Sequence, residues 1–207
     1  MTDLENDEVL LLSGGLDSTA LAAIRRPKLT LFIDYGQRPA LGEGRAAAAV
    51  AGSLKLDHLA IEINMAPIGG GLLADETPLS NAPSPEWWPY RNQLLCTIGA
   101  AVALRQNLPA VVIGSVRGDG DRHIDGTPEF YRRLDSVTSL QEGEVGVIAP
   151  ALERSTEELV RESGLGMETL GWTLSCHRSA TPCHACPGCN KREGVLVALG
   201  LVADRST

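Results

Sequence analysis

The residues best suited to chemistry lie near the start of the chain, where residues 13–19 read SGGLDST. An apolar run precedes this stretch and helix-forming sequence follows it, which predicts a loop between a strand and a helix. Unpaired N–H groups at a helix start carry partial positive charge, and Gly14 and Gly15 let that backbone approach an anion closely. Asp17 could hold magnesium or cap the helix, and further hydroxyl donors are Ser13, Ser18 and Thr19. The stretch predicts a phosphate-binding loop, without the GK[ST] ending of a Walker A motif.

A second group of reactive side chains lies near the C-terminus, where four of the five cysteines fall within residues 176–189. Such clustering in a cytosolic chain favours metal binding over disulfides. Four thiolates at these spacings can close a tetrahedral zinc site, and they are Cys176, Cys183, Cys186 and Cys189. An iron–sulfur cluster is the alternative, because C-x2-C-x2-C runs also occur in ferredoxins. The fifth cysteine, Cys96, lies in an apolar helical pattern and is predicted to be a core residue.

Bulk composition limits the remaining classes of function. The 207 residues suffice for one α/β domain with a small appendage, and a hydrophobic content of 43% is too high for a disordered chain. A net charge of −8 argues against binding long nucleic acid through its phosphates. No apolar run approaches the length of a membrane span, and the acidic opening MTDLENDE lacks the pattern of a signal peptide. We therefore expect a cytoplasmic protein with no nucleic-acid or membrane partner.

The elements that must position these groups alternate between strand and helix patterns. Strands are predicted at 8–12, 28–34, 58–63 and 110–114, and helices at 18–25, 43–54 and 92–106. This alternation predicts an α/β fold, a Rossmann-like parallel sheet with helices on both faces and ligands at the carboxyl ends of the strands. Residues 1–169 are expected to form this domain, and residues 170–207 a cysteine-held segment with a C-terminal helix. The Gly- and Pro-rich stretch 64–91 is predicted to be a long functional or mobile loop.

These motifs together resemble a known family. The string SGGxDS is the pyrophosphate-loop signature of ATP pyrophosphatases, and its combination with a C-terminal four-cysteine cluster resembles the QueC family, the 7-cyano-7-deazaguanine synthases. The match covers nearly the whole chain. It includes DYGQR at 34–38 with Glu43 beyond it, PYRN at 89–92, and Thr173, Ser175 and Arg192 around the cysteines.

The resemblance implies an adenine nucleotide alpha hydrolase-like fold and a defined reaction. Such enzymes adenylate the carboxylate of 7-carboxy-7-deazaguanine with ATP, ammonia displaces AMP to give an amide, and a second activation dehydrates the amide to the nitrile, preQ0. Magnesium assists, a zinc ion is structural, and the family is commonly homodimeric.

Site residues follow from the matching positions. Catalytic roles are expected for Asp17, Ser18, Arg38 and Arg91, the arginines because paired hydrogen bonds could neutralise phosphate or carboxylate oxygens. ATP is expected to contact Leu11, Ser13, Gly14, Gly15, Leu16, Asp17, Ser18, Thr19, Asp34 and Gln37. The deazaguanine is expected to contact Tyr35, Trp88, Tyr90, Arg91, Asn92, Asp119, His123 and Asp125. Simpler interpretations are surface ion pairs for the arginines, a helix cap for Asn92, and a core anchor or dimer contact for the aromatic residues.

The chain departs from the family in the half that would face the acceptor. His123, Ile124, Gly126 and Thr127 stand where the family has Tyr, Pro, Cys and Arg, although Asp119, Asp125, Pro128, Glu129 and Phe130 keep the register. The family's Ser-Lys becomes Ser155-Thr156, between the retained Pro150 and Glu158, and Pro39 replaces a histidine.

Three hypotheses follow from these departures. The chain is a preQ0 synthase with compensating residues such as Arg122 and His123. Alternatively, it resembles the QueC-like proteins of antiviral operons and joins the activated deazaguanine to an amine of a partner protein. The third hypothesis is a scaffold without catalysis, against which the intact phosphate loop argues. A tRNA-thiolating or nucleotide-amidating pyrophosphatase fits less well, because the chain is acidic and shows no separate RNA-binding domain.

Overall fold

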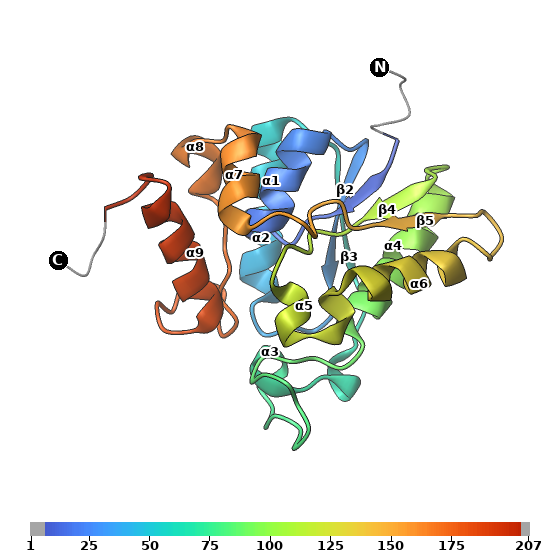
Figure 1. Ribbon diagram of the computed structural model, residues 1–207, viewed down its shortest axis with the longest axis horizontal. Helices are drawn as coiled ribbons and strands as arrows, with labels where there is room; N and C mark the ends of the chain where they lie inside the picture. Colours follow the sequence, from blue (N-terminus) through green and yellow to red (C-terminus); the bar gives the residue numbers. More distant parts are fainter. Residues whose placement is uncertain (1–6, 204–207) are drawn as a thin grey trace.

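The computed structural model describes residues 7–203 and shows a five-stranded parallel sheet in the order β3-β2-β1-β4-β5 (Figure 1). The strands are β1 (Val9–Leu11), β2 (Leu29–Asp34), β3 (His58–Glu62), β4 (Ala110–Val112) and β5 (Gly146–Ile148). The longer helices are α1 (Leu16–Arg25), α2 (Ala40–Leu54), α4 (Arg91–Arg105), α6 (Pro128–Thr138), α7 (Thr156–Ser163) and α9 (Pro187–Ala198). Short helical turns are η2 (Ala66–Ile68), α3 (Gly71–Ala74), α5 (Asp119–Arg122), η3 (Ile124–Gly126) and α8 (Met167–Leu170).

The predicted α/β fold with helices on both faces is confirmed. Successive residues of a strand point to opposite faces, so Leu10 packs with α1, α2, α7 and α9, whereas Val9 and Leu11 pack with α4 and α6. Figure 1 shows these two helical layers on either side of the sheet. All three of these strand residues are buried, as expected for a central parallel strand covered on both faces.

The predicted elements lie within a few residues of the observed ones, but the sequence analysis did not predict strand β5, helices α6 and α7 or the short helical turns. Strand β5 pairs with β4 in parallel, Val147 opposite Val111. Its three residues are too few to produce a periodic pattern, and glycine opens the strand, so sequence alone does not indicate it.

The order of the strands creates a position for a ligand between β1 and β4. From β1 the chain builds outward through β2 to β3, and it then returns to add β4 and β5 on the other side of β1. The loops after β1 and β4 therefore diverge, which leaves a crevice at the carboxyl ends of these strands. The phosphate loop follows β1 directly, so it borders this crevice.

The cysteine-rich segment packs against the phosphate-loop side of the sheet. Val195 and Leu196 of α9 are buried in the same core as α1 and α7. The division of the chain at residues 169 and 170 stays a prediction, and residues 1–6 of the acidic opening and 204–207 lie outside the described part. Within residues 7–203, no helix is both long and apolar enough to cross a membrane.

Candidate active site

The phosphate loop connects β1 to α1 with a geometry that requires glycine. Gly14 has a φ of +77°, and a Cβ there would lie 2.7 Å from the Cβ of Ala46 in α2. A side chain at this position would therefore clash with α2 as well as strain the backbone. The hydroxyls of Ser13 and Ser18 lie 3.1 Å apart, and Ser18 Oγ also donates to the carbonyl of Gly15. The loop is packed closely onto α2 and directs its hydroxyl groups toward the start of α1.

A cavity of about 360 Å³ opens beside this loop, a volume suited to a small-molecule ligand. Its wall comes from the loops after β1 and β4, the end of β2, and helices α4, α7 and α9. The predicted site residues that line it are Leu11, Ser13, Gly15, Leu16, Asp17, Ser18, Tyr35, Gln37, Arg91, Asn92, Asp119 and His123. The sequence thus assigned to one site residues that the fold brings together from four separate segments.

Asp17 is the carboxylate within the phosphate loop. Its Oδ2 accepts a hydrogen bond from Lys191 Nζ at 3.1 Å, while its Oδ1 is buried and has no hydrogen-bond partner. Burial raises the pKa of Asp17, although Lys191 and the facing hydroxyl of Thr156 partly oppose this shift. An unpartnered carboxylate oxygen beside a phosphate loop fits the oxygen preference of magnesium.

Asp119 is the second carboxylate near this position. Its Oδ2 accepts hydrogen bonds from Ser115 Oγ at 3.1 Å and from the backbone N–H of Val116 at 3.0 Å. Asp17 and Asp119 both line the cavity, and the negative charge of Asp119 contributes to the raised pKa of Asp17. The pair could share one hydrated cation with a bound phosphate.

Arg91 also lines the cavity. Burial disfavours its charge, but the nearby Tyr35, Asp125 and Glu43 outweigh burial and raise the pKa of the guanidinium. Burial also raises the pKa of Glu43, to about 7, even though its carboxylate accepts a hydrogen bond from Gln37 Nε2 at 2.8 Å. Gln37 in turn accepts from the backbone N–H of Tyr35, so this group of side chains is held in one arrangement.

The cavity wall also carries Glu86 and His177, which the sequence analysis did not assign, and Arg122, which it named only as a compensating residue. Glu86 is buried, its Oε1 pairs with Arg122, and its Oε2 has no hydrogen-bond partner. His123 Nε2 lies 3.4 Å from Ser84 Oγ, and burial lowers the pKa of both His123 and His177. Glu86, Arg122 and His177 come from three distant segments, and no motif in the sequence joins them.

Several predicted site residues do not reach the cavity. Arg38 forms an ion pair with Asp75 on an exposed surface, so the surface-pair interpretation is correct for this residue. The Asp34 carboxylate instead accepts from the backbone N–H of Gly36. Gly14, Thr19 and Asp125 are also absent from the cavity wall, although Asp125 contributes its backbone carbonyl to Asn92 Nδ2 at 3.1 Å.

Trp88 and Tyr90, in the PEWWPY stretch, also lie outside the cavity. Trp88 is only 2% exposed and packs edge-to-face on Tyr35, with ring centroids 4.9 Å apart. Its expected stacking on a substrate ring gives way to the core-anchor alternative, because a ring buried on all sides offers no face to a ligand. Tyr90 is 72% exposed and precedes α4 with a φ of +57°, so Asn92 is not the residue that caps the helix.

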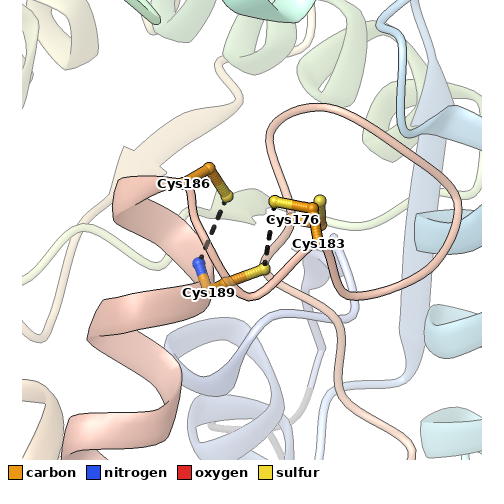
Figure 2. A group of neighbouring side chains, drawn as sticks. All are labelled: Cys176, Cys183, Cys186 and Cys189. Atoms are coloured by element: carbon orange, nitrogen blue, oxygen red, sulfur yellow. Dashed lines mark hydrogen bonds between the residues drawn. The ribbon is translucent and has the colours of Figure 1, made fainter.

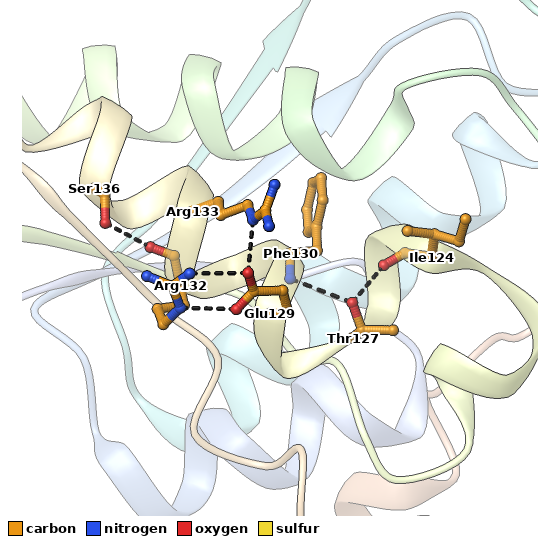
Figure 3. Close-up of polar contacts among 7 residues, drawn as sticks. All are labelled: Ile124, Thr127, Glu129, Phe130, Arg132, Arg133 and Ser136. Carbon is orange, nitrogen blue, oxygen red and sulfur yellow. Dashed lines mark hydrogen bonds and ion pairs between the residues drawn. The ribbon is translucent and has the colours of Figure 1, made fainter.

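Two side chains of the segment after β4, Thr127 and Glu129, do not line the cavity, and Figure 3 shows the polar contacts that they make instead. Thr127, at the family's arginine position, caps α6 by accepting from the backbone N–H of Phe130. Glu129 pairs with Arg132 and Arg133 on the exposed side of that helix. Of the four substituted positions, His123 and Gly126 line the cavity.

The four clustered cysteines converge as the spacing predicts (Figure 2). Their sulfur atoms all lie within 4.8 Å of one another, and Cys183 Sγ is 3.9 Å from Cys189 Sγ. Tetrahedral zinc with Zn–S bonds of 2.3 Å places its sulfurs about 3.8 Å apart. Backbone N–H groups also point at the sulfurs, that of His177 at Cys186 Sγ and that of Arg178 at Cys176 Sγ. The cluster therefore fits a metal ion such as zinc, which the four cysteines would bind as thiolates.

Comparison with known proteins agrees with this geometry. The family model described as "Queuosine biosynthesis protein QueC" matches residues 7–200. The chain is 32% identical to the 7-cyano-7-deazaguanine synthase of Synechococcus sp. (strain CC9605), over 93% of each chain. It is 31% identical to the enzyme of that name from Methanoculleus marisnigri, over 93% of this chain and 95% of the relative. It is 28% identical to 7-cyano-7-deazaguanine synthase 1 of Desulfitobacterium hafniense, over 91% and 90%.

Proposed function

The chain belongs to the QueC family, and from that premise we propose that it converts 7-carboxy-7-deazaguanine to 7-cyano-7-deazaguanine with ATP and ammonia. The observation that carries the proposal is that the SGGLDST loop and Arg91 line one cavity. The loop offers backbone amides and hydroxyls for phosphate, and Arg91 offers a cation for a carboxylate. This is the arrangement that joining a carboxylate to ATP requires.

The proposed reaction begins with attack of a carboxylate oxygen on the α-phosphorus of ATP, which releases pyrophosphate and leaves an acyl adenylate. Ammonia then attacks the acyl carbon, and AMP departs with the original carboxylate oxygen to give the amide. A second ATP activates the amide oxygen in the same way, again with release of pyrophosphate. Departure of the second AMP and loss of the nitrogen's protons form the nitrile.

The residues at the phosphate end have roles that follow from their charge and position. The N–H groups at the start of α1 and the hydroxyls of Ser13 and Ser18 would bind the pyrophosphate. Asp17 and Asp119 would hold magnesium, which supplies charge neutralisation on the phosphates. Arg91 would bind the substrate carboxylate, because its guanidinium lines the cavity and stays charged among Tyr35 and Glu43.

The cavity residues Glu86, His123 and His177 suit a guanine-like base. The unpartnered Oε2 of Glu86 can accept from ring and exocyclic N–H groups of the base, which removes the cost of leaving a buried oxygen unbonded. His123 and His177 favour the neutral imidazole because burial lowers each pKa. A neutral imidazole can accept the proton released when an amine attacks the adenylate.

The segment around His123 differs from the family, so we also propose an alternative acceptor, an amine of a partner protein. Ile124 is 84% exposed beside it, at a position where the family has proline. An amine carried by a partner protein would meet this exposed segment, and the product would then be a substituted amide and not a nitrile. Homodimerisation and a cytoplasmic location are further expectations that rest on the family.

Mass spectrometry of the product tests these proposals. The metal-loaded protein is incubated with ATP, magnesium, 7-carboxy-7-deazaguanine and ammonium. Nitrile and AMP are the expected products. Consumption of ATP with formation of only adenylate or amide would support the partner-amine reaction in place of nitrile synthesis. Absence of ATP consumption would support the non-catalytic scaffold.

A further inference from the structure

The positively charged side chains that line the cavity differ in the groups that they already contact. Among the described residues that line it, the lysine and arginine side chains are Arg91, Arg122, Lys191 and Arg192. Arg122 pairs with Glu86, and Arg192 donates to Thr173 Oγ1 at 2.8 Å and to the carbonyl of Leu170 at 3.0 Å. Arg91 lies among Tyr35, Glu43 and Asp125, and its Nε donates to Asn92 Oδ1 at 3.3 Å. Of these four side chains, Lys191 is the one that contacts the loop.

Lys191 reaches the loop from the far end of the sequence. Its Nζ lies 3.1 Å from Asp17 Oδ2, and its side chain stays 47% exposed along the cavity wall. An exposed ion pair of this kind contributes little to stability. A lysine is a compact charge on a flexible stem, so its ammonium can move from Asp17 to a phosphate oxygen that enters beside it.

The start of α9 fixes the position of Lys191. Cys186 caps this helix by accepting from the backbone N–H of Cys189, so two of the clustered cysteines define its first turn. Arg192, the next residue, ties the same turn to the segment at 170–173. The backbone N–H of Leu174 then donates to the carbonyl of Gly14, which holds this segment on the phosphate loop. Lys191 therefore projects from a turn that is anchored on both sides.

We propose that Lys191 supplies, from the cysteine-held helix α9, the mobile cation that binds the phosphate end of ATP, and that its pairing with Asp17 is the resting state of the empty site. The proposal rests on the proposed function. When phosphate enters, the ammonium moves to a phosphate oxygen and releases Asp17 Oδ2 for magnesium. The cysteine cluster thus contributes a side chain to the site besides holding the chain in place.

Calorimetric titration of the metal-loaded protein with magnesium pyrophosphate tests this inference without relying on activity. Lys191→Met keeps the length of the side chain and removes its charge, and Lys191→Gln keeps a hydrogen-bond donor for Asp17. Both are expected to weaken binding about tenfold, the loss typical of one charge-assisted contact. Lys191→Arg should bind within about threefold of the wild type. The matched control is Lys28→Ala, which breaks a similar exposed pair with Asp7 at 3.2 Å.

The outcomes separate this inference from the proposed function. If the wild type fails to bind magnesium pyrophosphate or ATP, the proposed function itself is wrong. If the wild type binds and both neutral variants bind equally well, only the role of Lys191 is wrong. A purely structural lysine would lower the melting temperature without ligand and leave pyrophosphate affinity unchanged, which would also overturn the inference. Lys191→Gln preserves a test if Lys191→Met does not fold.

Discussion

The backbone N–H of Leu174 donates to the carbonyl of Gly14 at 2.9 Å, so the chain entering the cysteine cluster is bonded to the phosphate loop. The next residue is close as well, since a Cβ on Gly15 would lie 3.6 Å from Ser175 Oγ. The C-terminal segment thus forms one wall of the phosphate site. Events at the cysteines are therefore expected to change the loop.

Loss of the metal should weaken both stability and phosphate binding. Because metal binding by clustered thiolates is coupled to folding, Cys183→Ser is expected to lower the melting temperature by on the order of 5 °C. It should also reduce affinity for magnesium pyrophosphate, since Leu174 would lose its fixed position. Metal analysis and calorimetry measure the two effects. Cys96→Ala is the control, because Cys96 is a buried residue of α4 and lies outside the cluster; this variant should keep one colourless metal ion per chain.

Removing the Asp17 carboxylate should abolish turnover while sparing the fold. Asp17→Asn is expected to lower release of pyrophosphate from ATP on the order of 100-fold, because magnesium loses an oxygen ligand at the phosphates. Burial raises the pKa of Asp17, so its charge disfavours folding and the variant should melt no lower than the wild type. Unchanged pyrophosphate release would show that the loop has been assigned the wrong role.

Local pattern predicted the sheet and the two reactive clusters. The SGGLDST loop and the cysteines are short continuous motifs, so the residues that act together also lie together in the sequence. Strand β5 was not predicted, because a strand of three residues is too short to show a periodic hydrophobic pattern. The alternation of strands and helices indicated a parallel sheet, but it did not predict the order of the strands or the crevice between β1 and β4.

Residues that join the site through tertiary packing could not be predicted in the same way. Glu86 lies in a loop whose composition indicates only irregular structure, and Lys191 lies two residues after Cys189, where no local pattern connects it to the phosphate loop. Trp88 shows the opposite error. An aromatic residue near a motif suggests a ligand, but burial against Tyr35 decides its role, and burial is not visible in a local pattern.

The buried Glu43 predicts a specific dependence of stability on pH. Its pKa in the folded protein is about 7, against an ordinary value of 4.5, so its contribution to stability is complete below about pH 4.5 and is lost as the pH rises through 7. Glu43→Gln stays neutral and can still accept from Gln37. The variant should therefore gain about 1–2 kcal/mol relative to the wild type between pH 5 and pH 8, since one pKa unit is worth about 1.4 kcal/mol and the cavity admits solvent. Denaturant unfolding at both pH values measures this, and an equal difference at both would contradict it.

Thr156 offers a way to separate the charge of Lys191 from the packing of α9. Thr156 is the first residue of α7, is 3% exposed, lines the cavity and faces the Asp17 carboxyl. Ser155 and Glu158 cap this helix reciprocally, so its start should hold a new side chain in place. Thr156→Lys in a Lys191→Met background would thus return an ammonium to the phosphate loop from α7 in place of α9.

We expect this double variant to bind magnesium pyrophosphate within about threefold of the wild type, compared with a tenfold loss for Lys191→Met alone. Its matched control is Thr156→Met in the same background, which adds a similar bulk without the charge and should not recover binding. Equal recovery by methionine would show that filled volume matters and not charge. No recovery by lysine would show that the ammonium must come from α9, and the cysteine cluster would then determine the direction of the charge as well as its presence.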